Sequence, residues 1–224
     1  MNLFLNELDR RIQQKHLLHH PFYQAWSKGE LSKECLIEYA KDYYHHVKAF
    51  PTYLSALHSH VEEPHTRRKL LENLVEEEAG TPNHPELWHQ FARGLGASEA
   101  EIDAYVPSSE MQTLVSTFKS ICSQGTVSEG LAALYAYESQ IPTICVSKIQ
   151  GLKEHYGIKD AKVWRYFSVH IGADEEHAAV ERELLNHYVK DEGASSLQAA
   201  DRVLDCLWNF LTGLCHKYQI AYAC

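Results

Sequence analysis

Carboxylate and imidazole side chains occur in this chain at spacings that suit a metal site. His170, Asp174 and His177 fall at 0°, about 40° and about −20° around an ideal helix, so they share one face. The turns on either side place apolar residues on the same face: Val163, Phe167, Leu184 and Tyr188. A solvated charged face would not carry apolar residues at both ends, so the pattern predicts three metal ligands in a core.

A further carboxylate interrupts the apolar stripe of segment 128–155, which the periodicity predicts as one helix. Glu138 stands in the middle of this stripe, whose other members are Leu131, Leu134, Ile141, Cys145 and Leu152. A carboxylate that faces a packed core is unfavourable unless it is paired, protonated or bound to a cation. Glu138 is therefore predicted to be a metal ligand, with a salt-bridged structural glutamate as the alternative.

The third acidic element is the run Glu76–Glu78, which is followed by His84. Leu70 and Leu74 would place Glu77 on the inner face, whereas Leu71 and Val75 would place Glu78 there. Helical arithmetic does not choose between the two glutamates, and a solvated acidic face is a third interpretation. His84 begins a stripe that continues through Trp88, Phe91 and Leu95.

Together, these segments supply three carboxylates and three imidazoles from separate helices. Helix bundles that bind two iron or two manganese ions project such side chains inward, and the mixed oxygen and nitrogen donors suit Fe or Mn better than structural zinc. Six ligands for two ions leave coordination positions for water, O₂ or substrate. A ferritin-like arrangement of ligands, which needs Glu-x-x-His on two helices, is rejected. Glu62-x-x-His65 spans a proline, and Glu86-x-x-His89 lies off the inner stripe.

Helical periodicity runs through almost the whole chain, which predicts an all-α bundle of seven to eight helices in a single domain, residues 1–224. A long stripe runs from Leu36 to Val61, and Ser32 is a plausible N-cap for it. The other helices are expected at 3–18, 66–79, 84–96, 109–122, 128–155, 160–189 and 195–219.

Composition limits the classes of function. The net charge of −9 argues against a nucleic-acid partner, and no apolar stretch approaches the length of a membrane span. The N-terminus lacks the features of a signal peptide, and six cysteines without a C-x-x-C pair indicate reduced thiols. We therefore expect a cytoplasmic protein.

Several longer motifs resemble those of the haem-oxygenase-like di-metal oxidases, and more closely the CADD-like group named after the chlamydial protein associating with death domains. The resemblance covers nearly all of the chain. It is carried by His20-Pro-Phe-Tyr-Gln-Ala-Trp26, Tyr39-Ala-Lys-Asp-Tyr-Tyr44, Lys48-Ala-Phe-Pro51, Pro82-Asn-His84, Tyr135-Ala-Tyr-Glu-Ser-Gln-Ile-Pro142 and His170-x-x-x-Asp174-x-x-His177.

The resemblance implies a specific function and site. It selects Glu77 over Glu78, so that the implied metal ligands are Glu77, His84, Glu138, His170, Asp174 and His177. Such proteins make p-aminobenzoate for folate synthesis by cutting the ring from one of their own tyrosines. They use O₂, an external reductant and two metal ions, Fe/Fe or Mn/Fe. The sacrificed tyrosine corresponds to Tyr23, a second implicated tyrosine to Tyr39, and the amino-donating lysine to Lys148.

Other functions remain open from the sequence. A metal-free oxidase similar to PqqC, or a thiamin-degrading enzyme similar to TenA with a cysteine nucleophile, would share the fold without needing six ligands. A non-enzymatic helical module that binds death domains of host proteins is a third class, and it would imply secretion into a host cell. A homodimer is expected, because members of this family form oligomers and because some helices have apolar faces that the core does not use.

Overall fold

A computed structural model describes residues 3–190 and 193–220, and these residues form helices without any strand. The elements are α1 (Leu3–Gln14), the short 3₁₀ helix η1 (Leu17–His19), α2 (Pro21–Lys28), α3 (Lys33–His60), α4 (Pro64–Glu78), α5 (His84–Leu95), α6 (Glu99–Asp103), α7 (Ser109–Gln124), α8 (Val127–Glu138), α9 (Ile141–Glu154), α10 (Arg165–Tyr188) and α11 (Ala194–Tyr218). The predicted all-α class is confirmed.

Three differences from the expected helices affect the site. The chain forms η1 and α2 after Gln14, where the expected first helix continued to residue 18. The expected helix 128–155 is two helices, α8 and α9, because the α8 register ends at Glu138 and Pro142 begins a new one. The expected helix 160–189 begins only at Arg165. Glu138 therefore lies at the end of a helix.

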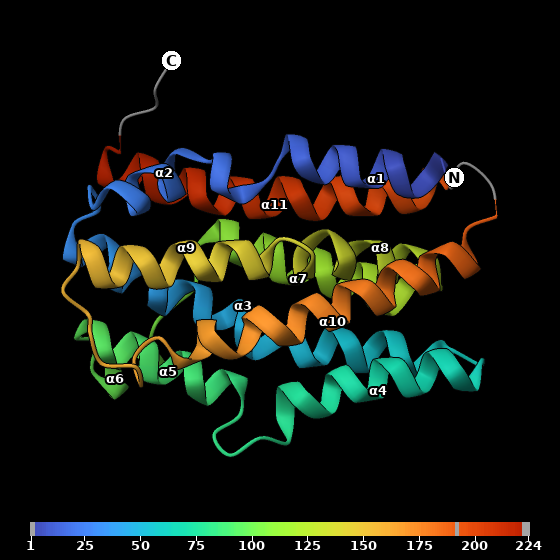
Figure 1. The fold of residues 1–224 in the computed structure, drawn as a ribbon, viewed down its shortest axis with the longest axis horizontal. Helices are drawn as coiled ribbons and strands as arrows, with labels where there is room; N and C mark the ends of the chain where they lie inside the picture. The colour runs from blue at the N-terminus through green and yellow to red at the C-terminus, as the bar shows by residue number, and fades with distance from the viewer. Residues whose placement is uncertain (1–2, 191–192, 221–224) are drawn as a thin grey trace.

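The helices lie roughly side by side along the long axis of the molecule (Figure 1). α11 packs on α8 and α7, α10 packs on α8 and α9, and α3 packs on α4, α5 and α7. The buried side chains of these helices form one continuous core. The core is rich in aromatic rings, and α10 crosses it beside the ends of α4 and α8.

The long helix α3 begins as the sequence predicts. The Ser32 side chain accepts a hydrogen bond from the backbone N–H of Cys35, which satisfies an otherwise unpaired donor of the first turn. The inner face of α3 carries Tyr39 and Tyr43, which stack with ring centroids 5.4 Å apart. This helix therefore brings tyrosines to the centre of the molecule.

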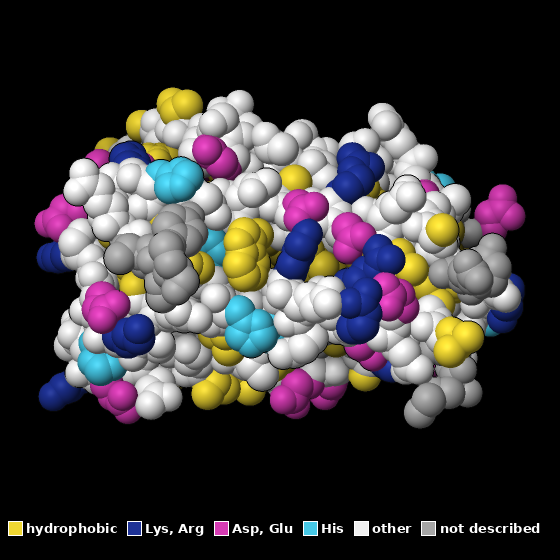
Figure 2. All heavy atoms as spheres, turned by 90° about the horizontal axis from the view of Figure 1, so that it is seen from above, with side chains coloured by type: hydrophobic (Ala, Val, Ile, Leu, Met, Phe, Trp, Pro, Cys, Tyr) yellow, Lys and Arg dark blue, Asp and Glu magenta, His cyan; other side chains and the backbone are white. Residues whose placement is uncertain are grey.

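The face formed by α1 and α11 mixes acidic and basic side chains over scattered apolar groups (Figure 2). Ion pairs join α1 to α11 at Arg11 with Asp201, and the residue after α1, Lys15, to Asp205 of α11. Such exposed pairs contribute little stability each, about 0–1 kcal/mol. α1 is held mainly by its buried side chains, which are Phe4, Leu5, Leu8 and Ile12.

None of the described helices is long and apolar enough to cross a membrane. The five cysteines within the described residues are free thiols, four of them buried, and Cys224 lies outside those residues.

Gly151 permits the close contact between α2 and α9. A Cβ atom at this position would lie 2.7 Å from Cδ1 and Nε1 of Trp26, whose ring is fully buried and whose Nε1–H donates to the carbonyl of Lys148. We expect Gly151→Ala to lower the free energy of unfolding by about 1–3 kcal/mol through overpacking, measured by denaturant titration.

Gly172→Ala is the matched control, because a Cβ at this helical position meets nothing within 4 Å. It should raise stability by up to about 1 kcal/mol through helix propensity. Equal stability changes in the two variants would contradict the packing role of Gly151.

Candidate metal centre

The first cluster consists of Glu77 at the end of α4, His84 at the start of α5 and His170 in α10. One ligand atom from each lies within 4.8 Å of the other two. His84 Nδ1 is 2.9 Å and His170 Nε2 is 3.8 Å from Glu77 Oε1, and all three side chains are buried. One carboxylate and two imidazoles thus converge on one point.

The second cluster consists of Glu138 at the end of α8 with Asp174 and His177 in α10, and it obeys the same 4.8 Å limit. His177 Nδ1 is 3.3 Å from Glu138 Oε1 and 3.6 Å from Asp174 Oδ1. The helix break after Glu138 frees this glutamate from the α9 register. The Asn73 side-chain amide donates to Glu138 Oε1 over 2.9 Å and holds the carboxylate toward α4.

Backbone and side-chain contacts orient the imidazoles. His170 Nδ1 lies 2.7 Å from the Tyr166 carbonyl, so Nδ1 carries the proton and Nε2 points toward Glu77. His177 Nε2 lies 3.1 Å from the half-exposed carboxylate of Glu76, which leaves Nδ1 facing the second cluster. A carbonyl or carboxylate behind an imidazole is the arrangement that fixes the tautomer of metal-binding histidines.

The charged groups of the two clusters are carboxylates and histidines that shift the pKa values of one another. Burial opposes ionisation of Glu77, but hydrogen bonds from His170 and His84 lower its pKa to about 2. Burial raises the pKa of Asp174, and His177 shows the complementary effect, since its pKa rises through contacts with Asp174 and Glu138 despite burial. Among the described residues no Lys or Arg forms an ion pair with these carboxylates, so histidines are their only positive partners.

The donor set fits iron or manganese. Buried carboxylates without lysine or arginine partners are stabilised by a cation, and mixed carboxylate and imidazole ligands suit Fe and Mn. Glu77, His84 and His170 would hold one ion, and Glu138, Asp174 and His177 would hold the other. An iron or manganese pair supplies O₂ activation and redox chemistry when bound.

The structure brings the six sequence-predicted ligands together as two adjacent triads. The structure also shows which of the two neighbouring glutamates faces the core. Glu77 is 3 % exposed, whereas Glu78 lies on the exposed side of α4 together with Leu71 and Val75. One buried carboxylate of the same face, Glu181, was not predicted as a site residue. Its spacing of four residues after His177 is the feature that could have identified it.

Tyr23, Tyr39 and Lys148 also meet, next to the clusters, buried among packed aromatic rings that we call the lysine pocket. Lys148 Nζ donates to the Tyr39 hydroxyl over 2.5 Å, and the Tyr39 and Tyr23 hydroxyls are 3.2 Å apart. The expected placement of Lys148 along one helix with Glu138 was wrong, because the chain turns between α8 and α9. That turn directs Lys148 into the aromatic core.

Six aromatic rings surround the Lys148 amine at 4.8–5.9 Å from their centroids: Tyr23, Trp26, Tyr39, Tyr43, Trp88 and Phe167. A chain of ring contacts continues to the first cluster. Tyr166 lies 4.8 Å from Trp88 and 4.0 Å from His170 between ring centroids. The lysine pocket and the metal-ligand clusters are thus connected through aromatic side chains.

Comparisons with known proteins agree with this geometry. Residues 37–208 match the family described as iron-containing redox enzymes. The chain is 49% identical to the 4-aminobenzoate synthase of Chlamydia pneumoniae over 98% of both chains, and 41% identical to that of Nitrosomonas europaea over 100% of this chain and 95% of the other. A solved Shewanella denitrificans protein with a haem-oxygenase-like fold aligns over 98% of both chains with a TM-score of 0.82 at 18% identity.

Metal loading should depend on Glu77 and not on its neighbour. We expect the native protein to retain two Fe²⁺ or Mn²⁺ ions per chain after anaerobic loading, and Glu77→Gln to lose tight binding of one ion. Each ion should stabilise the fold by about 2.7 kcal/mol when free metal is 100 times Kd. Elemental analysis and thermal unfolding measure both effects.

The exposed Glu78 offers the matched control, and Glu78→Gln should bind and respond to metal as the native protein does. Equal metal content in the two variants would contradict the assignment of Glu77.

Proposed function

The chain belongs to the family of iron-containing redox enzymes with a haem-oxygenase-like fold, and from this premise we propose that it makes 4-aminobenzoate at a two-metal centre. Relatives at 41–49% identity across nearly the whole chain bear the name 4-aminobenzoate synthase. The two buried ligand triads support a centre with two ions, Fe/Fe or Mn/Fe. O₂ and an external reductant are the proposed co-substrates.

The proposed source of the product ring is Tyr23. A tyrosine side chain carries Cβ and the hydroxyl at para positions, as 4-aminobenzoate carries its carboxyl and amino groups. With O₂ as the oxidant, the conversion requires cleavage of the Cα–Cβ bond and oxidation of Cβ to a carboxylate. It also requires replacement of the phenol oxygen, which leaves as water, by a nitrogen whose bond to carbon in the donor side chain must break. An amine must therefore lie near the hydroxyl end of the ring.

The observation that carries the proposal is the hydrogen-bonded row from Lys148 Nζ through the Tyr39 hydroxyl to the Tyr23 hydroxyl. Lys148 Nζ also lies 5.4 Å from the centroid of the Tyr23 ring. The nitrogen donor thus stands at the end of Tyr23 where the new carbon–nitrogen bond is needed. Tyr39 positions both groups and links them for proton transfer.

Burial keeps the Lys148 amine reactive. It lowers the pKa of Lys148 to about 7, because aromatic rings and the Cys145 thiol surround the amine and no carboxylate among the described residues pairs with it. An uncharged amine is nucleophilic, whereas an ammonium ion is not. Burial also raises the pKa of Tyr23 and Tyr39 well above the usual value, so both enter the reaction as neutral phenols.

A cysteine-dependent mechanism fits the structure less well. Burial raises the pKa of the Cys145 thiol, which faces the lysine pocket, and raises those of Cys35 and Cys122 to about 12. Thiols of this kind do not supply a thiolate nucleophile near neutral pH.

Tyr23→Phe should yield no 4-aminobenzoate, because the ring would lack the oxygen that nitrogen replaces. Tyr53→Phe is the control, since it removes a hydroxyl from another fully buried tyrosine outside this pocket. Product is measured by chromatography after incubation with metal, reductant and O₂. Native yield from Tyr23→Phe would exclude this tyrosine as the source, while leaving an oxidase that acts on another substrate.

The initial rate of product formation should rise with pH. With a pKa of about 7 for Lys148, the neutral fraction increases from about one tenth at pH 6 to about nine tenths at pH 8. Lys148→Arg stays charged throughout this range and should give no product. A flat native profile between these pH values would contradict a titrating Lys148 as the donor.

A further inference from the structure

Glu181 is a buried carboxylate that forms no ion pair with a basic side chain among the described residues. Its side chain lies in the core with a residue exposure of 3 %, and neither carboxylate oxygen has a hydrogen-bond partner among the described residues. The nearby basic residues are engaged elsewhere, since Lys69 pairs with Glu72 and Arg182 pairs with Asp9. A carboxylate in this position is unfavourable unless a cation or a proton joins it.

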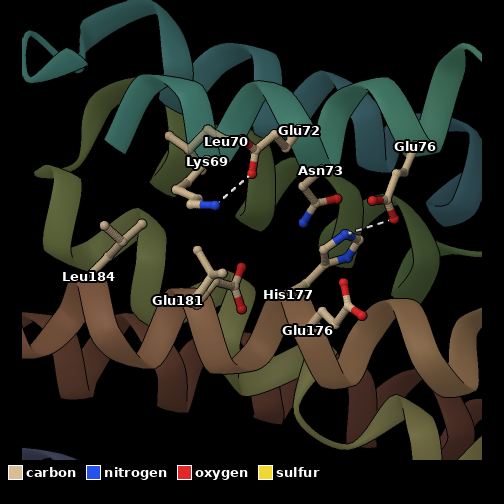
Figure 3. Close-up of a pocket in the computed structure, with 10 residues that line it drawn as sticks. Lys69, Leu70, Glu72, Asn73, Glu76, Glu176, His177, Glu181 and Leu184 are labelled. Atoms are coloured by element: carbon tan, nitrogen blue, oxygen red, sulfur yellow. Dashed lines mark hydrogen bonds and ion pairs between the residues drawn. The ribbon is translucent and has the colours of Figure 1, made fainter. Parts of the chain in front are cut away.

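The geometry of α10 aims Glu181 at the second cluster. Glu181 follows Asp174 by seven residues and His177 by four, so all three lie on one face within about 60°. Helical side chains lean toward the helix N-terminus, which carries the Glu181 carboxylate back over the turn of His177. Figure 3 shows Glu181 and His177 side by side on α10, both directed toward α4.

A small cavity joins these groups. It has a volume of about 100 Å³ between α4 and α10, and Asn73, His177 and Glu181 line it. Asn73 Nδ2 donates to Glu138 Oε1, whereas Asn73 Oδ1 has no hydrogen-bond partner among the described side chains. Glu181 therefore opens onto the same cavity as His177, a ligand of the second cluster, and as Asn73, which holds the Glu138 carboxylate.

On this basis, which assumes the two-metal centre of the proposed function, we propose that Glu181 is a fourth protein ligand of the second metal site, beside Glu138, Asp174 and His177. The charges support this assignment. Glu77, Glu138, Asp174 and Glu181 carry four negative charges when ionised, and two divalent ions carry four positive charges. Without Glu181, the three remaining carboxylates would leave the buried centre with one positive charge in excess.

The test compares Glu181→Gln with Glu176→Gln. Glu176 lies on the same helix and lines the same cavity but is exposed, so its variant controls for the loss of one acidic charge near the site. The probe is Mn²⁺ alone, added anaerobically to the metal-free full-length chain. Binding is measured by competition with a chelator and by the electron paramagnetic resonance spectrum of the bound ion.

We expect Glu181→Gln to weaken binding of one of the two Mn²⁺ ions by at least about tenfold, and to change the spectrum of that ion only. Glu176→Gln should bind as the native chain does. The metal-free Glu181→Gln variant should unfold at the same or a higher temperature than the native chain, because an unpaired buried acid has been removed. A purely structural role would instead lower this temperature.

Native affinity for both ions in Glu181→Gln would overturn the proposal. If the native chain itself binds fewer than two ions, the two-metal centre of the proposed function fails instead. Should Glu181→Gln not fold, Glu181→Asp takes its place, because it keeps the charge and withdraws the oxygens by one methylene. Weaker binding of one ion by this variant supports the ligand role, and unchanged binding overturns it.

Discussion

The burial of acidic side chains without lysine or arginine partners is the constraint on which the rest of this structure depends. Glu77, Glu138 and Asp174 lie where α4, α8 and α10 meet, and among the described residues histidines are the only basic side chains that pair with them. Ionised carboxylates in a low-dielectric core require cations. α4 ends just after Glu77, α8 ends at Glu138, and α10 continues without interruption past Asp174. Together, these features bring the three carboxylates close to one another.

The chain separates this acidic centre from Lys148, the one buried lysine in the part of the chain that the structure describes. Lys148 would neutralise a carboxylate if it formed a salt bridge, but the turn between α8 and α9 places it among aromatic rings. Trp88, one of the rings around Lys148, contacts Tyr166, which in turn contacts His170. The metal-ligand clusters therefore form an acidic region that attracts cations. The rings around Lys148 form a second region, where burial favours the uncharged amine. The proposed oxidative amination needs both conditions.

The sequence allowed much of this site to be predicted, and the physical reason differs between residues. His170, Asp174 and His177 share a face within one helix, so local periodicity suffices to group them. Glu77 and Glu78 are distinguished only by which side of α4 packs on the core, which is a tertiary property. The end of α8 at Glu138 is not visible in the apolar pattern, because the stripe continues past Pro142 to Cys145 and Leu152. Pro142 is tolerated there because it lies in the first turn of α9. The meeting of Tyr23, Tyr39 and Lys148 depends on three separate helices, and no spacing within one segment encodes it.

The central claim is that the protein consumes part of itself, and the mass of the intact chain tests it most directly. The native protein would be loaded with metal, given reductant and O₂, and compared with an anaerobic sample by mass spectrometry and peptide mapping. The account predicts a loss of mass that maps to Tyr23, with modification at Lys148, in proportion to the 4-aminobenzoate released. Product formation from a chain whose mass at both residues is unchanged would contradict it.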